Sequence, residues 1–192
     1  MVDLYRFLDV LSECCATDDV LVTCAGSTFN AGPQGIKLKQ GMRFIVQGGL
    51  APMGYTLPAG IGISVALNKQ RAICLSGEGS LQLNIQELQS VVHYQLPIKL
   101  FVINNEGYLT IRSTQERYFN RCIGESPTTG VSFPDTEKIA KAYGIPFVRL
   151  DSEQCLAATI DTVLNSDSAY ICEVMIPTDQ KVIRPQEELK EA

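Results

Sequence analysis

The sequence has one histidine, His93, no cysteines spaced as CxxC, and no apolar run near the roughly 18 residues that a membrane span needs. A single histidine excludes a multi-histidine metal site, and a Ser-His-Asp triad would depend on His93 alone. Because His93 follows an apolar helical stretch, we interpret it as structural. Asp3 and Asp9 interrupt the N-terminal apolar residues, so we expect no signal peptide.

Positive charge is also scarce. Lys and Arg number 16 against 21 Asp and Glu, a net charge of -5, which gives no electrostatic footprint for nucleic acid. The seven cysteines are odd in number, and Cys14 and Cys15 are adjacent. Since most of them have apolar neighbours, as Cys74 does, we expect reduced, buried thiols in a cytoplasmic protein.

What is present indicates one globular domain over 1–192, with a loose tail from about 178 to 192. Helical and strand-like patterns alternate along the chain. The predicted strands are 20–23, 43–46, 71–76, 98–103, 147–150 and 169–176. The predicted helices are 4–11, 57–67, 81–92, 135–143 and 156–164. We expect a glycine-rich loop over 24–35, and 106–133 has no clear pattern.

Several of the predicted strands are apolar throughout, which is typical of strands buried on both faces of a parallel sheet. Six such strands separated by helices predict an α/β domain of three layers, with a roughly six-stranded parallel sheet between helices. Ligands of such folds lie beyond the carboxyl ends of the strands. We therefore expect ligand-binding residues directly after the strands.

Three such segments contain glycine and polar residues, and we expect them to meet at one edge of the sheet. They are Cys24-Ala25-Gly26-Ser27-Thr28, Gly77-Glu78-Gly79-Ser80 and Asn104-Asn105-Glu106-Gly107-Tyr108.

The segment 77–80 opens a predicted helix, where free N–H groups and the helix dipole favour an anion. Glu78 is itself negative, so a phosphate there needs a cation between them. Mg²⁺ suits this place, because it shares its oxygen ligands between a few protein groups and phosphates, and Asn105 offers an amide oxygen. A lone GxG is often only a tight turn, and the dinucleotide fingerprint fails at Gln82.

The motifs together resemble those of thiamine diphosphate-dependent enzymes, in which GDG precedes NN by about two dozen residues. Here GEG is followed by NN, and Glu78 lies 27 positions before Asn105. The segment GGLAPMGYTLPAGIG at 48–62 is similar to the part of acetolactate synthases that carries the thiazolium end of the cofactor. NIQEL at 84–88 and LPIK at 96–99 are similar too. The resemblance runs from residue 3 to about 178, the C-terminal diphosphate-binding domain.

The resemblance implies thiamine diphosphate and Mg²⁺ as cofactors. It assigns the metal to Glu78, the side chain of Asn105 and the carbonyl of Gly107. Met53 would bend the cofactor into a V shape, and the Ala51 carbonyl would accept a hydrogen bond from its amino group. The implied cofactor-binding residues are Gly26, Ser27, Thr28, Ala51, Met53, Gly77, Gly79, Ser80, Asn105 and Tyr108.

The resemblance also implies what this chain does not supply. The catalytic glutamate of the family comes from a separate pyrimidine-binding domain, and we assign no catalytic residue here. We therefore expect the chain to work with such a domain in a homo-oligomer that acts on small 2-oxo acids. Alone, it is expected to be inactive.

Three alternatives stay open. The chain is a domain of a longer acetolactate synthase-like enzyme, the small subunit of a split phosphonopyruvate- or sulfopyruvate-type decarboxylase, or a non-catalytic binding module. Glu78 stands where the family usually has Asp, which shifts the ligand oxygen by on the order of 1 Å unless the loop adjusts. The segment 106–130 either meets an anionic substrate or forms a solvated surface. Its candidate residues are Tyr108, Arg112, Arg117, Tyr118 and Arg121.

Overall fold

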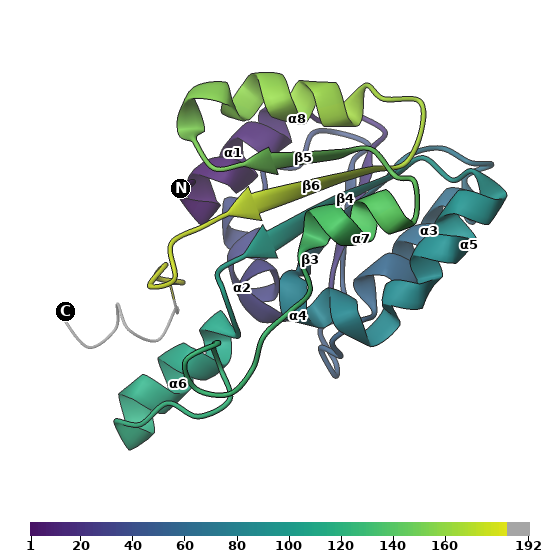
Figure 1. Ribbon diagram of the computed structural model, residues 1–192. Coiled ribbons are helices and arrows are strands. Elements are labelled where there is room, and N and C mark those ends of the chain that lie inside the picture. Colours follow the sequence, from purple (N-terminus) through teal and green to yellow (C-terminus); the bar gives the residue numbers. More distant parts are fainter. Residues whose placement is uncertain (184–192) are drawn as a thin grey trace.

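A computed structural model describes residues 1–183 and contains one six-stranded sheet in the order β2-β1-β3-β4-β6-β5 (Figure 1). Every neighbouring pair of strands is parallel. The strands are β1 (Val20–Thr23), β2 (Arg43–Val46), β3 (Ala72–Gly77), β4 (Ile98–Asn104), β5 (Phe147–Leu150) and β6 (Tyr170–Met175). The predicted parallel α/β fold is therefore confirmed.

Helices cover both faces of the sheet. They are α1 (Leu4–Cys14), α2 (Gly26–Gly35), α3 (Thr56–Ala66), α4 (Glu78–Leu81), α5 (Leu88–Tyr94), α6 (Leu109–Phe119), α7 (Thr136–Ala142) and α8 (Leu156–Leu164). Short 3-10 helices span Gln82–Glu87 and Glu153–Cys155. One apolar layer lies under α1, α2 and α8, and the other lies under α3, α5 and α7.

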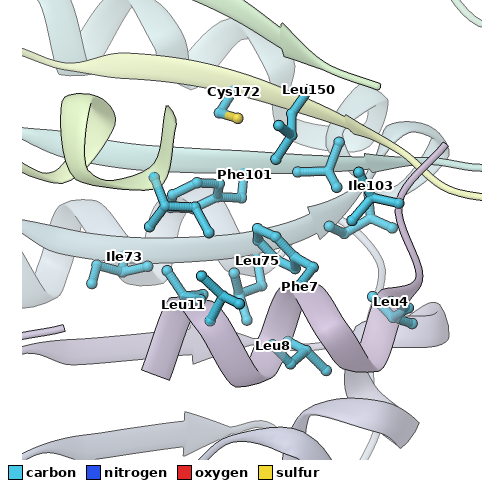
Figure 2. Packing of buried hydrophobic residues seen from close by; sticks show 14 of the residues in the cluster. Leu4, Phe7, Leu8, Leu11, Ile73, Leu75, Phe101, Ile103, Leu150 and Cys172 are labelled. Carbon is cyan, nitrogen blue, oxygen red and sulfur yellow. The ribbon is translucent and has the colours of Figure 1, made fainter. Parts of the chain in front are cut away.

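The alternation of side chains along the central strands divides the core between these layers. Ile73 and Leu75 of β3 face α1 and α8, whereas Cys74 between them faces α3. Figure 2 shows Phe7 of α1 beside Phe101 of β4, with ring centroids 5.4 Å apart. Each fully buried side chain of this size contributes roughly 1.5–3 kcal/mol of transfer free energy. The doubly covered sheet is thus the rigid base of the molecule.

One predicted loop is a helix. Residues 24–35 contain three glycines and Pro33, which favour a loop, yet Gly26–Gly35 forms α2. A Cβ on Gly32 would lie 2.7 Å from Cζ of Phe44, so glycine lets this helix approach the ring closely. Tertiary packing therefore overrides the weak helix propensity of the segment.

The predicted helix over 81–92 is broken. Asn84 leaves the helical region at φ -141° and ψ 31°, and its Nδ2 donates to the Gly54 carbonyl over 3.0 Å. Leu81 and Leu88 are buried as the stripe predicts, but Val92 is 39% exposed. The unassigned segment 106–133 contains α6, which projects from the rest of the fold (Figure 1).

Residues 178–183 lie against α1. Gln180 accepts a hydrogen bond from the Leu4 amide and donates to Asp3, each over 3.0 Å, and the Ile183 amide donates to the Tyr5 hydroxyl over 2.9 Å. The rest of the predicted tail, 184–192, lies outside the described residues. Within 1–183, no helix is both long and apolar enough to cross a membrane. All seven cysteines lie in this range as free thiols, and the buried ones are Cys15, Cys24, Cys74 and Cys172.

A lysine is buried near the start of β4, an inner strand of the sheet. Lys99 of β4 has no exposed surface, and its Nζ donates to the carbonyls of Ser166 and Ser168, the latter over 2.6 Å. Burial lowers the pKa of Lys99 to about 8 from the usual 10.5. Between these values the unfolded chain keeps a proton that the folded chain releases, so Lys99 makes stability rise with pH in this window.

Lys99→Met tests this arrangement. The stability of the unsubstituted chain relative to the Met variant should rise by about 1.4 kcal/mol per pH unit between pH 8 and pH 10. Urea unfolding of both proteins at several pH values measures it, and the difference cancels other titrating groups. Lys138→Met, at an exposed site on α7, controls for the loss of one lysine. A difference between the proteins that is constant from pH 7 to pH 10 would contradict the assignment.

Candidate functional site

A cavity of about 220 Å³ lies where the chain leaves β1, β3 and β4. β1 lies between β2 and β3, so the direction of strand addition reverses here, which is where open α/β sheets bind ligands. The loop 47–54 after β2 closes another side. The lining residues are Ala25, Gly26, Ser27, Ala51, Met53, Gly77, Glu78, Gly79, Ser80, Asn105, Gly107, Tyr108, Leu109, Thr110 and Ile111.

The structure brings the residues singled out from the sequence together. Nine of the ten implied cofactor-binding residues line the cavity, and so do Glu78 and Gly107. Thr28 is the exception. It is fully buried, with its hydroxyl 2.7 Å from that of Thr23 and donating to the Ala25 carbonyl over 3.2 Å. Thr28 thus stabilises the turn after β1 rather than lining the cavity.

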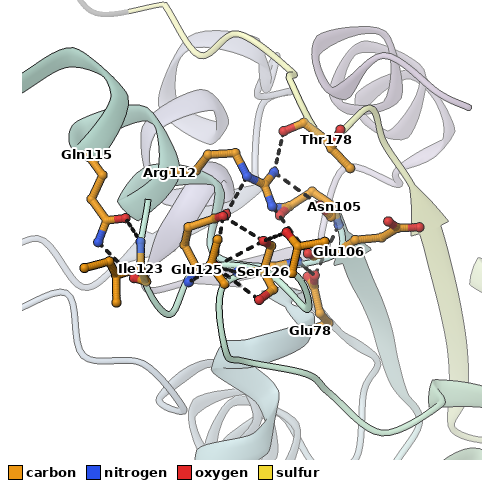
Figure 3. Close-up of polar contacts among 12 residues, drawn as sticks. Glu78, Asn105, Glu106, Arg112, Gln115, Ile123, Glu125, Ser126 and Thr178 are labelled. Carbon is orange, nitrogen blue, oxygen red and sulfur yellow. Dashed lines mark hydrogen bonds and ion pairs between the residues drawn. The ribbon is translucent and has the colours of Figure 1, made fainter. Parts of the chain in front are cut away.

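Glu78, the first residue of α4, lies on the wall of the cavity and is 4% exposed. Its Oε1 accepts hydrogen bonds from the amides of Gly107 over 2.8 Å and Asn105 over 3.3 Å (Figure 3). Its Oε2 is buried and has no partner, and neither has Oδ1 of Asn105. Two residues that follow different strands and line one cavity therefore each have a buried oxygen without a partner.

A buried carboxylate that is ionised and has no cation beside it lowers the stability of the fold. Burial raises the pKa of Glu78 to about 7, although the two amide hydrogen bonds oppose the shift. The residues fit a hard cation, because a carboxylate and an amide oxygen are ligands that Mg²⁺ prefers. In 1–183, no group of three or more His, Cys, Asp and Glu is arranged to hold a metal. The remaining ligands of a cation here would have to be backbone, water or phosphate oxygens.

The loop after β2 is held by the side chains of Gln47 and Ser80, in addition to that of Asn84. Oε1 of Gln47 accepts from the amides of Leu50 and Ala51 over 3.0 Å each, and Ala51 adopts a left-handed φ of 47°. The Gly54 amide donates to the Ser80 hydroxyl over 3.0 Å, which ties the loop to α4. Sequence reasoning missed Gln47, whose only signal is its place directly after a strand.

Met53 lies on this loop and is 40% exposed, so it is not a core methionine. Gly79 also lines the cavity, at a position where close contact requires glycine. A Cβ there would be 2.4 Å from Cε1 of Tyr108 and 2.7 Å from Cζ of Phe133. These two rings pack edge to face, with centroids 5.1 Å apart. The wall beside the N-terminus of α4 is thus backbone backed by aromatic rings.

Only one of the five candidate substrate residues of 106–130 lines this cavity. Tyr108 lines the cavity, whereas the guanidinium of Arg112 is directed at Glu125 and backbone carbonyls. Arg117 lies over the ring of Tyr118, which is 63% exposed, and Arg121 is exposed. His93 does not line the cavity and packs against the Tyr94 ring.

Glu78→Gln should stabilise the metal-free chain. At pH 8 we expect a gain of about 1–3 kcal/mol, since the variant has no buried unpaired carboxylate. A raised folded-state pKa makes the unsubstituted chain lose stability as pH rises from 4.5 to about 7, so the gain should develop across that window. Urea unfolding in a chelator measures it, with the exposed Glu13→Gln as control. Equal stability of Glu78→Gln and the unsubstituted chain at pH 8 would contradict the prediction.

Comparison with known proteins gives a consistent result. Residues 25–174 match the family model described as "Thiamine pyrophosphate enzyme, C-terminal TPP binding domain". The large subunit of acetolactate synthase isozyme 2 from Escherichia coli is 34% identical over 88% of this chain and 30% of its own length. An acetolactate synthase large subunit from Cyanidium caldarium is 31% identical over 77% of this chain and 25% of its own.

A chloroplastic acetolactate synthase 1 from Nicotiana tabacum is 28% identical over 92% of this chain. The chain spans less than a third of the length of each of these three relatives. The family implies thiamine diphosphate, which is another name for thiamine pyrophosphate, and Mg²⁺ as its cofactors. The match covers most of the chain, and this chain belongs to the thiamine pyrophosphate enzymes, as their C-terminal TPP-binding domain.

Proposed function

We propose that this chain binds the Mg²⁺-diphosphate half of thiamine diphosphate within an enzyme that acts on 2-oxo acids, as acetolactate synthases do. The observation that carries the proposal is that Oε2 of Glu78 and Oδ1 of Asn105 are both buried without a hydrogen-bond partner, on two residues that line the same cavity. A cation between the protein and a diphosphate would give both oxygens a partner. The carbonyl of Gly107 is proposed as the third protein ligand.

The remaining walls support the same assignment. The amides of Gly79 and Ser80 open a helix and favour phosphate oxygens beside the metal. Met53 and Ala51, on the loop after β2, face the cavity from another side and would hold the bent cofactor. When bound, thiamine diphosphate supplies the carbon nucleophile that attacks the carbonyl of a 2-oxo acid. The chain itself contributes binding, orientation and exclusion of water.

The rest of the active site is proposed to come from a pyrimidine-binding domain. The curated relatives are more than three times as long as the matched segment, so such a domain has room in a longer chain. We propose that assembly into a homo-oligomer completes the site. A cytoplasmic location stays a prediction, because several relatives are named as chloroplastic.

Cofactor binding should depend on both the metal and the diphosphate. Calorimetric titration of the chain should detect thiamine diphosphate with Mg²⁺ and not in a chelator. Inorganic diphosphate with Mg²⁺ should compete, because the chain holds that half, whereas thiamine should not. Glu78→Gln should abolish the Mg²⁺-dependent binding of thiamine diphosphate, and Glu13→Gln should leave that binding unchanged. Binding of thiamine diphosphate that is equally tight without metal would refute the ligand assignment.

Turnover should require the other domain. With saturating thiamine diphosphate and Mg²⁺, the 192-residue chain should release CO₂ from pyruvate at a negligible rate, because no acidic residue here is assigned to the aminopyrimidine. Addition of a pyrimidine-binding domain from the same protein should restore activity. Rates typical of enzymes, about 1–10³ s⁻¹, from the chain alone would show that the site is complete without a partner.

A further inference from the structure

We infer that Arg112, paired with Glu125, is a positioning residue for the metal-binding loop 105–107; this rests on the proposed function. The sequence offered Arg112 only as a possible contact of the substrate. Its side chain is 12% exposed and that of Glu125 is 4% exposed, so the pair is largely removed from water. Arg112 lies beside the loop 105–107, and its side chain holds that loop rather than a substrate.

The guanidinium of Arg112 donates hydrogen bonds to the backbone of the loop 105–107 (Figure 3). Nε donates to Oε2 of Glu125 over 2.6 Å, and Nη1 and Nη2 donate to the carbonyls of Asn105 and Glu106 over 3.4 Å and 3.3 Å. Nη1 also donates to the carbonyl of Thr178, beyond β6. The Glu106 carbonyl and the Gly107 amide belong to the same trans peptide and point in opposite directions. The hydrogen bond from Arg112 to that carbonyl therefore directs the Gly107 amide toward Oε1 of Glu78.

Arg112 and Glu125 together form a clamp on the loop 105–107, to which Glu125 contributes its backbone. Its backbone carbonyl accepts from the Tyr108 amide over 2.7 Å. A Cβ on Gly107 would lie 2.0 Å from that carbonyl and 2.7 Å from Nη2 of Arg112, so both residues press directly on the loop. Gly107 has a φ of +153°, and its amide lies 2.8 Å from Oε1 of Glu78.

The clamp is itself well supported. Burial opposes ionisation of Glu125, but hydrogen bonds from Ser126 and Arg112 outweigh it and lower its carboxyl pKa. Gln115 of α6 exchanges two hydrogen bonds with the backbone of Ile123, of 2.9 Å and 3.1 Å, which fixes the return of the chain toward Glu125. The irregular segment after α6 therefore holds the metal-binding loop against Glu78. Without it, the hydrogen bonds that hold residues 105–107 beside Glu78 would lose this support.

Arg112→Lys tests the inference, because lysine keeps the charge but cannot form the planar fork. In the full 192-residue chain, we expect the dissociation constant for Mg²⁺, titrated with thiamine diphosphate present, to rise about 10- to 100-fold, as is typical when a residue that orients metal ligands is lost. Glu125→Gln should act in the same direction. The double variant should be no weaker than the worse single variant, since both act through one clamp.

Arg71→Lys is the matched control. Arg71 forms a similar buried pair with Asp19, over 2.5 Å and 2.6 Å, and donates to the Leu164 carbonyl over 3.0 Å, but it lies at the opposite end of β3. The Arg71→Lys substitution should lower the melting temperature of the metal-free chain about as much as Arg112→Lys does. It should change the Mg²⁺ affinity less than about threefold. Unchanged Mg²⁺ affinity in Arg112→Lys, or an equal loss in Arg71→Lys, would overturn the positioning role. Absence of Mg²⁺-dependent binding in the unsubstituted chain would instead overturn the proposed function and this inference with it.

Discussion

The candidate site depends on one interaction, the double hydrogen bond from the amides of Asn105 and Gly107 to Oε1 of Glu78. It joins the end of β4 to the start of α4, which follows β3. Because Glu78 is buried, this bond also decides which way Oε2 is directed. The N-terminus of α4 and the loop after β4 are thereby fixed relative to each other. Any ligand that binds both must match a geometry that is already set.

The sheet makes that geometry possible. β3 and β4 are paired in parallel over six residues, so both strands end at the same edge, within one residue of each other in register. The first asparagine of the NN pair is also tied to β6. Asn104 donates to Glu173 over 2.8 Å, and Glu173 in turn accepts from Thr136 and Arg149. The loop is thus connected to β6 and to β5, while Asn105 and Gly107 line the cavity.

Much of this was predictable from sequence, and the parts that were not share a cause. All six strands and the convergence of Glu78, Asn105 and Met53 follow from apolar runs and from a resemblance that covers most of the chain. The helix α2 and the break at Asn84 were not predicted, because each depends on a contact with a residue distant in sequence. The same holds for the Arg112–Glu125 pair. Its members lie 13 positions apart across an irregular segment, where no periodicity marks them as partners.

The glutamate that replaces the usual aspartate can be understood in this frame. An aspartate at position 78 would be shorter by one methylene, whereas glutamate reaches from α4 to the amides of the loop after β4. With Oε1 engaged by two N–H groups, only Oε2 is left for a cation, so glutamate would act as a monodentate ligand. Mg²⁺ accepts this readily, since it takes one or two carboxylates and fills its other positions with water and phosphate oxygens. The extra methylene would then let one carboxylate do both things. Its Oε1 accepts hydrogen bonds from the loop, and its Oε2 would bind the cation.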